Sequence, residues 1–227
     1  MSDTTTTEKT AAAKSRSDIY GLLAAVYQQE VTPQLLQQIR DPQFVGVLSA
    51  LGLELEGDFF QKPEEELLED LAVEFARLFL GPGKHISPHE SVHHERPEGD
   101  WSRFWGASTV EVKKFIESTG LSYADDYSGI PDHIAVEFEF MRHVTLREKQ
   151  AWEEAQEETA KGCREIEKKF IEDHLICWIP AFCDKVIHQT ESPFYRLWAE
   201  MTKGFLEFEM ENMKLNGDGD RNKGDQE

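Results

Sequence analysis

Apolar residues recur along most of the chain at the three- and four-residue spacing that is typical of amphipathic helices, and strand-like alternation is hard to find. Pro63 followed by Glu64–Glu66 predicts a helix start, because acidic side chains in a first turn interact favourably with the helix dipole. The residues that follow at helical spacing are Leu68, Leu71, Phe75, Leu78 and Phe79. Gly81-Pro82-Gly83 then predicts the end of this helix.

Two further helices are expected in the middle of the chain. Ser108 and Glu111 have the spacing of a capping box, which predicts a helix that begins at Ser108 and ends near Thr119. Another helix is expected after Pro131, because proline is favoured in a first helical turn. Its buried stripe would consist of Ile134, Phe138, Met141 and Thr145.

The last part of the chain predicts two more helical segments. One is expected to run to Cys177, and a kink or a new helix is expected at Pro180, because proline cannot donate a backbone hydrogen bond. Ser192-Pro193 predicts the start of the final helix. The apolar face of that helix would consist of Phe194, Leu197, Trp198, Met201, Phe205 and Phe208.

These elements predict an all-α protein, in which helices pack on helices in a single globular multi-helix domain. We expect this domain to span residues 18–213, between disordered tails at 1–17 and 214–227. The stretch near 81–104 is rich in Gly and Pro but also carries histidines and tryptophans. Long loops inside domains are often functional, so we expect an ordered loop that covers a groove.

Composition and charge narrow the functions that the chain could have. The 227 residues include 24 Lys and Arg against 44 Asp and Glu, a formal net charge of −20. Nucleic acid is therefore not an expected partner, because phosphate binding needs Lys and Arg, whereas a basic peptide would be attracted. Three cysteines without zinc-ligand spacing do not indicate a disulfide framework or a metal site. With no apolar run long enough to span a membrane and no signal-like stretch, we expect a cytoplasmic protein without an integral membrane segment.

The most informative polar residues follow Pro131. Asp132 places a carboxylate near the positive end of a helix dipole, and His133 beside it has an ordinary pKa close to neutral pH. His133 and Glu137 are one helical turn apart and could pair. Two polar groups at the end of a rigid element can serve a binding site, although short polar caps of this kind are more often structural.

Other segments accompany this motif at a distance. Residues 74–83 read Glu-Phe-Ala-Arg-Leu-Phe-Leu-Gly-Pro-Gly, and residues 87–92 read Ser-Pro-His-Glu-Ser-Val. Downstream, residues 174–182 read His-Leu-Ile-Cys-Trp-Ile-Pro-Ala-Phe. In this order, and over about residues 18–213, these segments resemble the TorD/DmsD family of cytoplasmic redox-enzyme maturation chaperones.

The resemblance implies a non-enzymatic chaperone that binds the twin-arginine leader peptide of a molybdenum-containing oxidoreductase subunit, the apo form of that subunit, or both. Carboxylates would meet the leader arginines as charge-assisted hydrogen bonds, and an apolar groove would hold the remainder. Besides the client, a second copy of the chain is a candidate partner, in a homodimer. No cofactor, metal or catalytic residue is expected. The residues that the resemblance implies for the leader pocket are Phe75, Leu78, Phe79, Pro88, His89, Asp132 and His133.

Two departures from the family pattern affect this pocket. Many members carry the proline two residues before the aspartate, where this chain has Ile130 and places Pro131 directly before Asp132. His89 stands where leader-binding members often carry Trp. We therefore expect a changed pocket shape, and the identity of the client stays open.

Two alternatives also remain open. A chaperone of the same fold could bind the body of a client that lacks a leader, as nitrate-reductase assembly proteins do. A helical metal-dependent enzyme could instead be built around His85, His89, Glu90 and His93, because Glu90 and His93 have the Glu-x-x-His spacing of di-iron bundles. That class of site needs a second such motif, which the sequence lacks, so the metal alternative is the weaker one.

Overall fold

The protein is built from helices throughout the part of the chain that the computed structural model describes, which comprises residues 2–50, 52–55, 57–81, 85–94, 105–124 and 127–221, with side chains from 6 to 213. The described residues contain no strand, only an isolated antiparallel bridge between His89 and His133. The predicted all-α fold is therefore confirmed. Its elements are α1 (Ser2–Gln28), α2 (Pro33–Ile39), α3 (Pro42–Ala50), α4 (Gly57–Gln61), α5 (Glu64–Phe75), the π-helix η1 (Ala76–Leu80), α6 (Glu90–His93), α7 (Ala107–Ser118), α8 (Ile134–Glu153), α9 (Glu157–Phe170), the π-helix η2 (Ile171–Leu175), α10 (Ile176–Gln189) and α11 (Pro193–Arg221).

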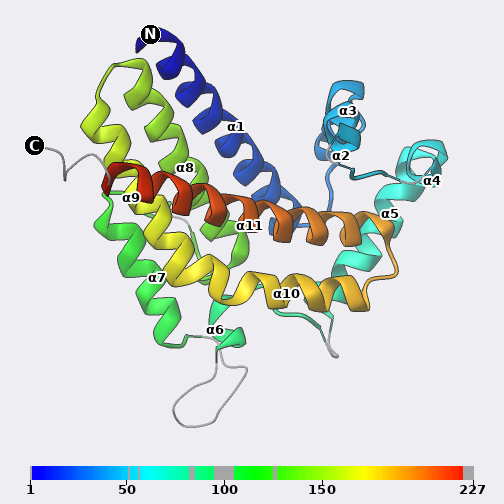
Figure 1. Ribbon diagram of the computed structural model, residues 1–227. Coiled ribbons are helices and arrows are strands. Elements are labelled where there is room, and N and C mark those ends of the chain that lie inside the picture. The colour runs from blue at the N-terminus through cyan, green and yellow to red at the C-terminus, as the bar shows by residue number, and fades with distance from the viewer. Residues whose placement is uncertain are drawn as a thin grey trace, which may run out of the picture.

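The long helices form the body of the molecule. Helix α1 packs along α8, α8 packs against α9, and α11 packs along α10 and crosses α1 (Figure 1). The short helices α2, α3 and α4 project at one end, next to α5 (Figure 1). None of the described helices is both long enough and apolar enough to cross a membrane.

Aromatic rings fill the core where these helices meet. The ring of Tyr20 on α1 lies 4.9 Å from Phe205 on α11 and 6.1 Å from Phe138 on α8, measured between ring centroids. Burying a side chain of this size contributes about 1.5–3 kcal/mol, so these contacts hold α1 firmly from Tyr20 onward. Other fully buried rings belong to Trp178, Trp198, Tyr195, Phe170 and Phe182.

Several predicted helix starts are confirmed. Helix α5 begins directly after Pro63 with Glu64–Glu66 in its first turn, and α11 begins at Pro193. The helix predicted from Ser108 to about Thr119 is also present, as α7 from Ala107 to Ser118. Its predicted capping box does not form, because α7 begins without a side-chain cap and Ser108 is buried.

The predicted kink or new helix at Pro180 is wrong. Pro180 lies inside α10, and the irregular turn is η2, which ends just before α10 begins. A π-helical turn widens the backbone hydrogen-bonding pattern, so the chain changes geometry upstream of the proline rather than at it.

The chain ends also differ from the predicted disordered tails. Helix α1 begins at Ser2 and already buries Ala13, Arg16 and Ser17, so the segment predicted as a tail belongs to the folded domain. Helix α11 continues to Arg221, beyond the predicted boundary. Phe208, expected on its buried face, is 55 % exposed. Of the loop expected near 81–104, residues 82–84 and 95–104 lie outside the described residues.

Candidate functional site

The Arg-Leu-Phe segment lies where α5 changes into η1, and one buried carboxylate fastens it. Glu74 accepts hydrogen bonds from the Arg77 guanidinium at 2.6 and 2.8 Å, from the Thr190 hydroxyl at 2.7 Å and from the Glu191 N–H at 2.9 Å. Burial opposes ionisation of Glu74, but these hydrogen bonds outweigh it and lower its pKa to about 2. The ionised carboxylate thus ties this segment to the connection between α10 and α11.

Phe75, Leu78 and Phe79, which the resemblance places in a pocket, lie in the hydrophobic core and are only 1–4 % exposed. The Phe79 ring stacks on Phe182 of α10, with the centroids 5.9 Å apart. The three side chains therefore anchor the Arg-Leu-Phe segment in the core and do not line a pocket. Leu80, at the end of the same π-helical turn, is 64 % exposed.

The Pro88 and Asp132 motifs, more than forty positions apart, lie side by side. The Pro88 carbonyl accepts the Ile134 N–H at 2.9 Å, and the Asp132 carbonyl accepts the Glu90 N–H at 3.0 Å. The Asp132 carboxylate, fully buried, accepts the Ser91 N–H at 2.7 Å. Asp132 therefore holds the loop that carries α6 against the start of α8.

His89 and His133 meet across this pairing, with ring centroids 4.8 Å apart in an edge-to-face arrangement. His133, rather than Pro131 or Asp132, forms the helix start, because its Nδ1 accepts the Ala135 N–H at 3.1 Å. Both rings are half-buried, and burial lowers the pKa of each, that of His133 to about 3. At neutral pH both imidazoles are uncharged, so they present hydrogen-bonding groups without a positive charge.

Two buried glutamates, Glu90 and Glu137, form another part of the site. Glu90 of α6 receives a hydrogen bond from His174 Nδ1 at 3.0 Å and from His94 Nε2 at 3.0 Å. Burial raises the pKa of Glu137 well above its usual range, reinforced by the neighbouring charges of Glu90 and Asp132. The Glu137 carboxyl group accepts the Trp178 Nε1–H at 3.1 Å. The expected pairing of His133 with Glu137 is replaced by this contact.

These contacts bring together the loop at 87–92, the start of α8 and the segment at 174–182. A model of the family described as the nitrate reductase delta subunit matches residues 41–184, more than half of the chain and including all these segments. The chain belongs to the nitrate reductase delta subunit family.

Curated relatives resemble the chain over nearly its whole length. A chaperone protein TorD from Photobacterium profundum is 24 % identical over 207 residues, covering 86 % of this chain and 93 % of the relative. TorD from Shewanella piezotolerans is 23 % identical and covers 87 % of this chain and 92 % of the relative. TorD from Vibrio cholerae is 22 % identical over 86 % of this chain and 90 % of the relative.

A solved structure shares the fold. The crystal structure of a candidate redox enzyme maturation protein from Archaeoglobus fulgidus aligns with a TM-score of 0.50 at 20 % sequence identity. The alignment covers 85 % of this chain and 93 % of that one. At this identity the likeness shows the helical fold and leaves the function to other observations.

The loop histidines contact backbone and side-chain groups of the protein itself. His93 Nε2 interacts with the Ser87 carbonyl at 2.7 Å, and its ring lies 5.1 Å from Trp178. His89 Nδ1 lies 3.1 Å from the Ser87 hydroxyl. Among the described residues, which include His85, no three His, Cys, Asp or Glu side chains are grouped so that they could hold a metal ion.

Sequence reasoning missed Glu90, Glu137 and His174 as one network. A signal was present for Glu137, because it lies within the stripe of Ile134, Phe138 and Met141 that predicts the buried face of α8. A carboxyl group on a buried helix face requires a partner, but the sequence alone does not indicate which one. His174 is 84 positions from Glu90, and only the packing of η2 against the loop reveals their contact.

Proposed function

We propose that this protein is a cytoplasmic, non-enzymatic chaperone that assists the maturation of a redox enzyme. Its client would be the apo form of a molybdenum-containing subunit that carries a twin-arginine leader. One observation carries the proposal, namely that the chain matches TorD chaperones over 86–87 % of its length. The convergence of the three motif segments on one site supports it.

The client surface we propose is centred on His89 and His133, the half-buried residues of the expected pocket. Phe75, Leu78, Phe79, Pro88 and Asp132 are buried and would shape this surface without direct contact in the conformation described. Uncharged imidazoles suit such a surface, because they do not repel a guanidinium. His133 accepts the Ala135 N–H at Nδ1, so its Nε2 is a donor, and of the two rings we expect His89 to accept a hydrogen bond from a leader arginine. The net charge of −20 adds a long-range attraction for a basic leader.

Titration of a fluorescent leader peptide, with two arginines followed by an apolar stretch, tests this surface. His89→Ala removes a ring from the centre of the proposed surface, and we expect binding to weaken about five- to tenfold, as when one hydrogen bond is lost. His143→Ala is the control, because it also removes a histidine ring, but an exposed one on α8 rather than the ring in the loop before α6. Equal affinity of the His89→Ala variant and the wild type would place the leader elsewhere.

A second candidate client is supported by the family model, which describes a subunit of nitrate reductase. A protein of that type would bind the body of a client that has no leader. Titration with a full-length apo client and with the same client lacking its leader separates the two. Equal affinity for both forms would favour body recognition, whereas loss of binding on deletion would favour the leader.

A further inference from the structure

The segment between α7 and α8 places two stacked tyrosines beside the candidate site. The rings of Tyr123 and Tyr127 lie 5.5 Å apart between centroids, with their planes inclined by 23°. The Tyr127 N–H also donates to the Ala124 carbonyl at 2.9 Å, which keeps the two residues close together. Tyr123 is half-buried and packs against the hydrophobic core, whereas Tyr127 is 38 % exposed. Tyr123 thus supports an aromatic ring that is open to solvent.

One backbone carbonyl connects Tyr127 to the start of α8. The Ile130 carbonyl accepts hydrogen bonds from the Tyr127 hydroxyl at 3.0 Å and from the His133 N–H at 3.2 Å. Gly129 leaves the space for this contact, because a Cβ at that position would lie 2.4 Å from the Tyr127 hydroxyl oxygen. The Tyr127 ring is therefore held next to His133, which together with His89 forms the centre of the proposed client surface.

The surroundings of the two tyrosines favour a cation. Burial raises the pKa of both phenols and the negative charge of Asp132 raises it further, so both rings are uncharged at neutral pH. An aromatic face attracts cations through its quadrupole, and a negative charge nearby adds to this attraction. Neither His89 nor His133 opposes a cation, because burial keeps both imidazoles uncharged. Tyr127 can therefore receive a cation at the edge of the proposed client surface.

We propose that Tyr127 is a binding residue that stacks against the guanidinium of a leader arginine and makes the protein prefer arginine to lysine. The inference rests on the proposed function, because that function supplies an arginine-bearing peptide. A guanidinium is planar and weakly hydrated, so it can lie flat on the phenol ring while its edge still donates hydrogen bonds to neighbouring groups. A lysine ammonium is compact and strongly hydrated, so it gains less from the ring. Tyr123 positions the ring, and Tyr127 makes the contact.

Titration of the full-length protein with the fluorescent twin-arginine peptide, and with an otherwise identical Lys-Lys peptide, tests this contact. Tyr127→Leu removes the ring, so we expect twin-arginine binding to weaken about fivefold. Lys-Lys binding should weaken less, so the ratio of the two affinities should fall. Tyr127→Phe keeps the ring and should retain the ratio. Phe208→Leu is the control, because it removes an exposed ring from α11, and neither affinity should change.

Nuclear magnetic resonance of the isotope-labelled twin-arginine peptide supplies a measurement on the wild type that does not depend on a variant folding. Protons that lie above an aromatic ring are shifted upfield, so the side-chain δ protons of one leader arginine should move upfield when the peptide binds. The shift should persist with Tyr127→Phe and be lost with Tyr127→Leu. A purely structural role of Tyr127 would produce no such dependence on the ring.

The failures have distinct meanings. An unchanged affinity ratio with Tyr127→Leu, no upfield shift in the wild type, or binding of the full-length apo client without any binding of the peptide would overturn stacking on Tyr127 while leaving the proposed function intact. An equal loss of both peptides with Tyr127→Phe and Tyr127→Leu would assign Tyr127 a structural role through Ile130, which also overturns the inference. Failure of the wild type to bind either the peptide or the full-length apo client would instead overturn the proposed function.

Discussion

Asp132 offers a direct test of whether a buried carboxylate holds the candidate site together. The side chain is fully buried, its Oδ2 accepts the Ser91 N–H at 2.7 Å, and its Oδ1 has no partner among the described residues. Asp132→Asn keeps the shape and one acceptor, so it should cost about 1 kcal/mol, the difference between a charged and a neutral hydrogen bond. Asp132→Ala leaves the Ser91 N–H unpaired in a small cavity and should cost about 2–4 kcal/mol.

Urea unfolding of the wild type and both variants measures these costs. In a chain of this size, each kcal/mol corresponds to a change of about 2–4 °C in Tm, which gives a second estimate. Hydrogen exchange at the Ser91 amide reports the local effect, and its protection should fall in the order wild type, Asn variant, Ala variant. Leader binding should be measured well below the transition, so that every variant is folded.

Two results would refute this reasoning. An Ala variant within about 0.5 kcal/mol of the wild type, a change typical of ordinary surface substitutions, would show that Asp132 does not hold the loop. An Asn variant with unchanged stability and unchanged Ser91 protection, but with leader binding weakened more than about tenfold (1.4 kcal/mol), would show that the carboxylate contacts a leader arginine directly. In that case the site must open on binding to expose Asp132.

Three further predictions follow from charge and coordination. The pKa of Glu74 is lowered to about 2, so its contribution to stability is present above pH 4.5 and is lost as the pH falls toward 2. The stability advantage of the wild type over Glu74→Gln in urea titrations should therefore shrink between pH 4.5 and 2, and a constant difference would show that the Glu74 carboxylate does not stabilise the fold through these hydrogen bonds. Leader binding should weaken with rising salt, which screens exposed charges over about 8–10 Å, but should not vanish, because apolar contacts are not screened; an affinity independent of salt would make the acidic surface irrelevant. Protein purified without added metal should contain far less than one equivalent of zinc or iron, and chelator should leave its Tm unchanged; a stoichiometric, tightly bound ion would revive the metal-enzyme alternative.

Helix content and several helix starts could be predicted from the sequence, because they depend on local properties. Apolar spacing sets which face of a helix is buried, and Pro63 and Pro193 favour the starts of α5 and α11 through a fixed φ angle. The same local reasoning failed for the side-chain cap at Ser108 and for the break at Pro180. Ser108 is buried instead of capping α7, and Pro180 lies within α10.

The candidate site was predictable only in part. The motif segments that carry Pro88, His89, Asp132 and His133 could be located in the sequence, and the structure brings them into contact. Whether a motif residue faces solvent or the core was not predictable, because the exposure of Asp132 depends on the loop that covers it. Phe79 is likewise a core residue because Phe182 of α10 packs against it.

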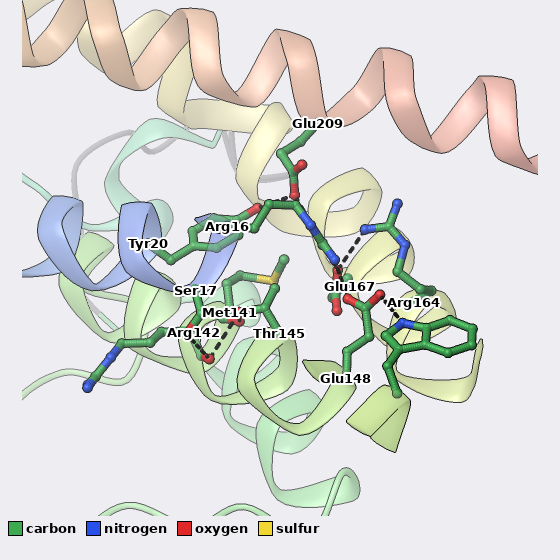
Figure 2. Close-up of polar contacts among 11 residues, drawn as sticks. Arg16, Ser17, Tyr20, Met141, Arg142, Thr145, Glu148, Arg164, Glu167 and Glu209 are labelled. Atoms are coloured by element: carbon green, nitrogen blue, oxygen red, sulfur yellow. Dashed lines mark hydrogen bonds and ion pairs between the residues drawn. The ribbon is translucent and has the colours of Figure 1, made fainter. Parts of the chain in front are cut away.

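Only the tertiary structure revealed the two buried ionic clusters. Arg16 lies in a segment of Thr, Ala and Lys that resembles a tail, yet its three glutamate partners lie on α8, α9 and α11 (Figure 2). Glu90 and His174 are similarly remote in the sequence. Helical periodicity is a short-range property of the backbone, so a single sequence displays it directly. The pairing of buried charges depends on where distant helices meet, and that is determined by the packing of the whole core.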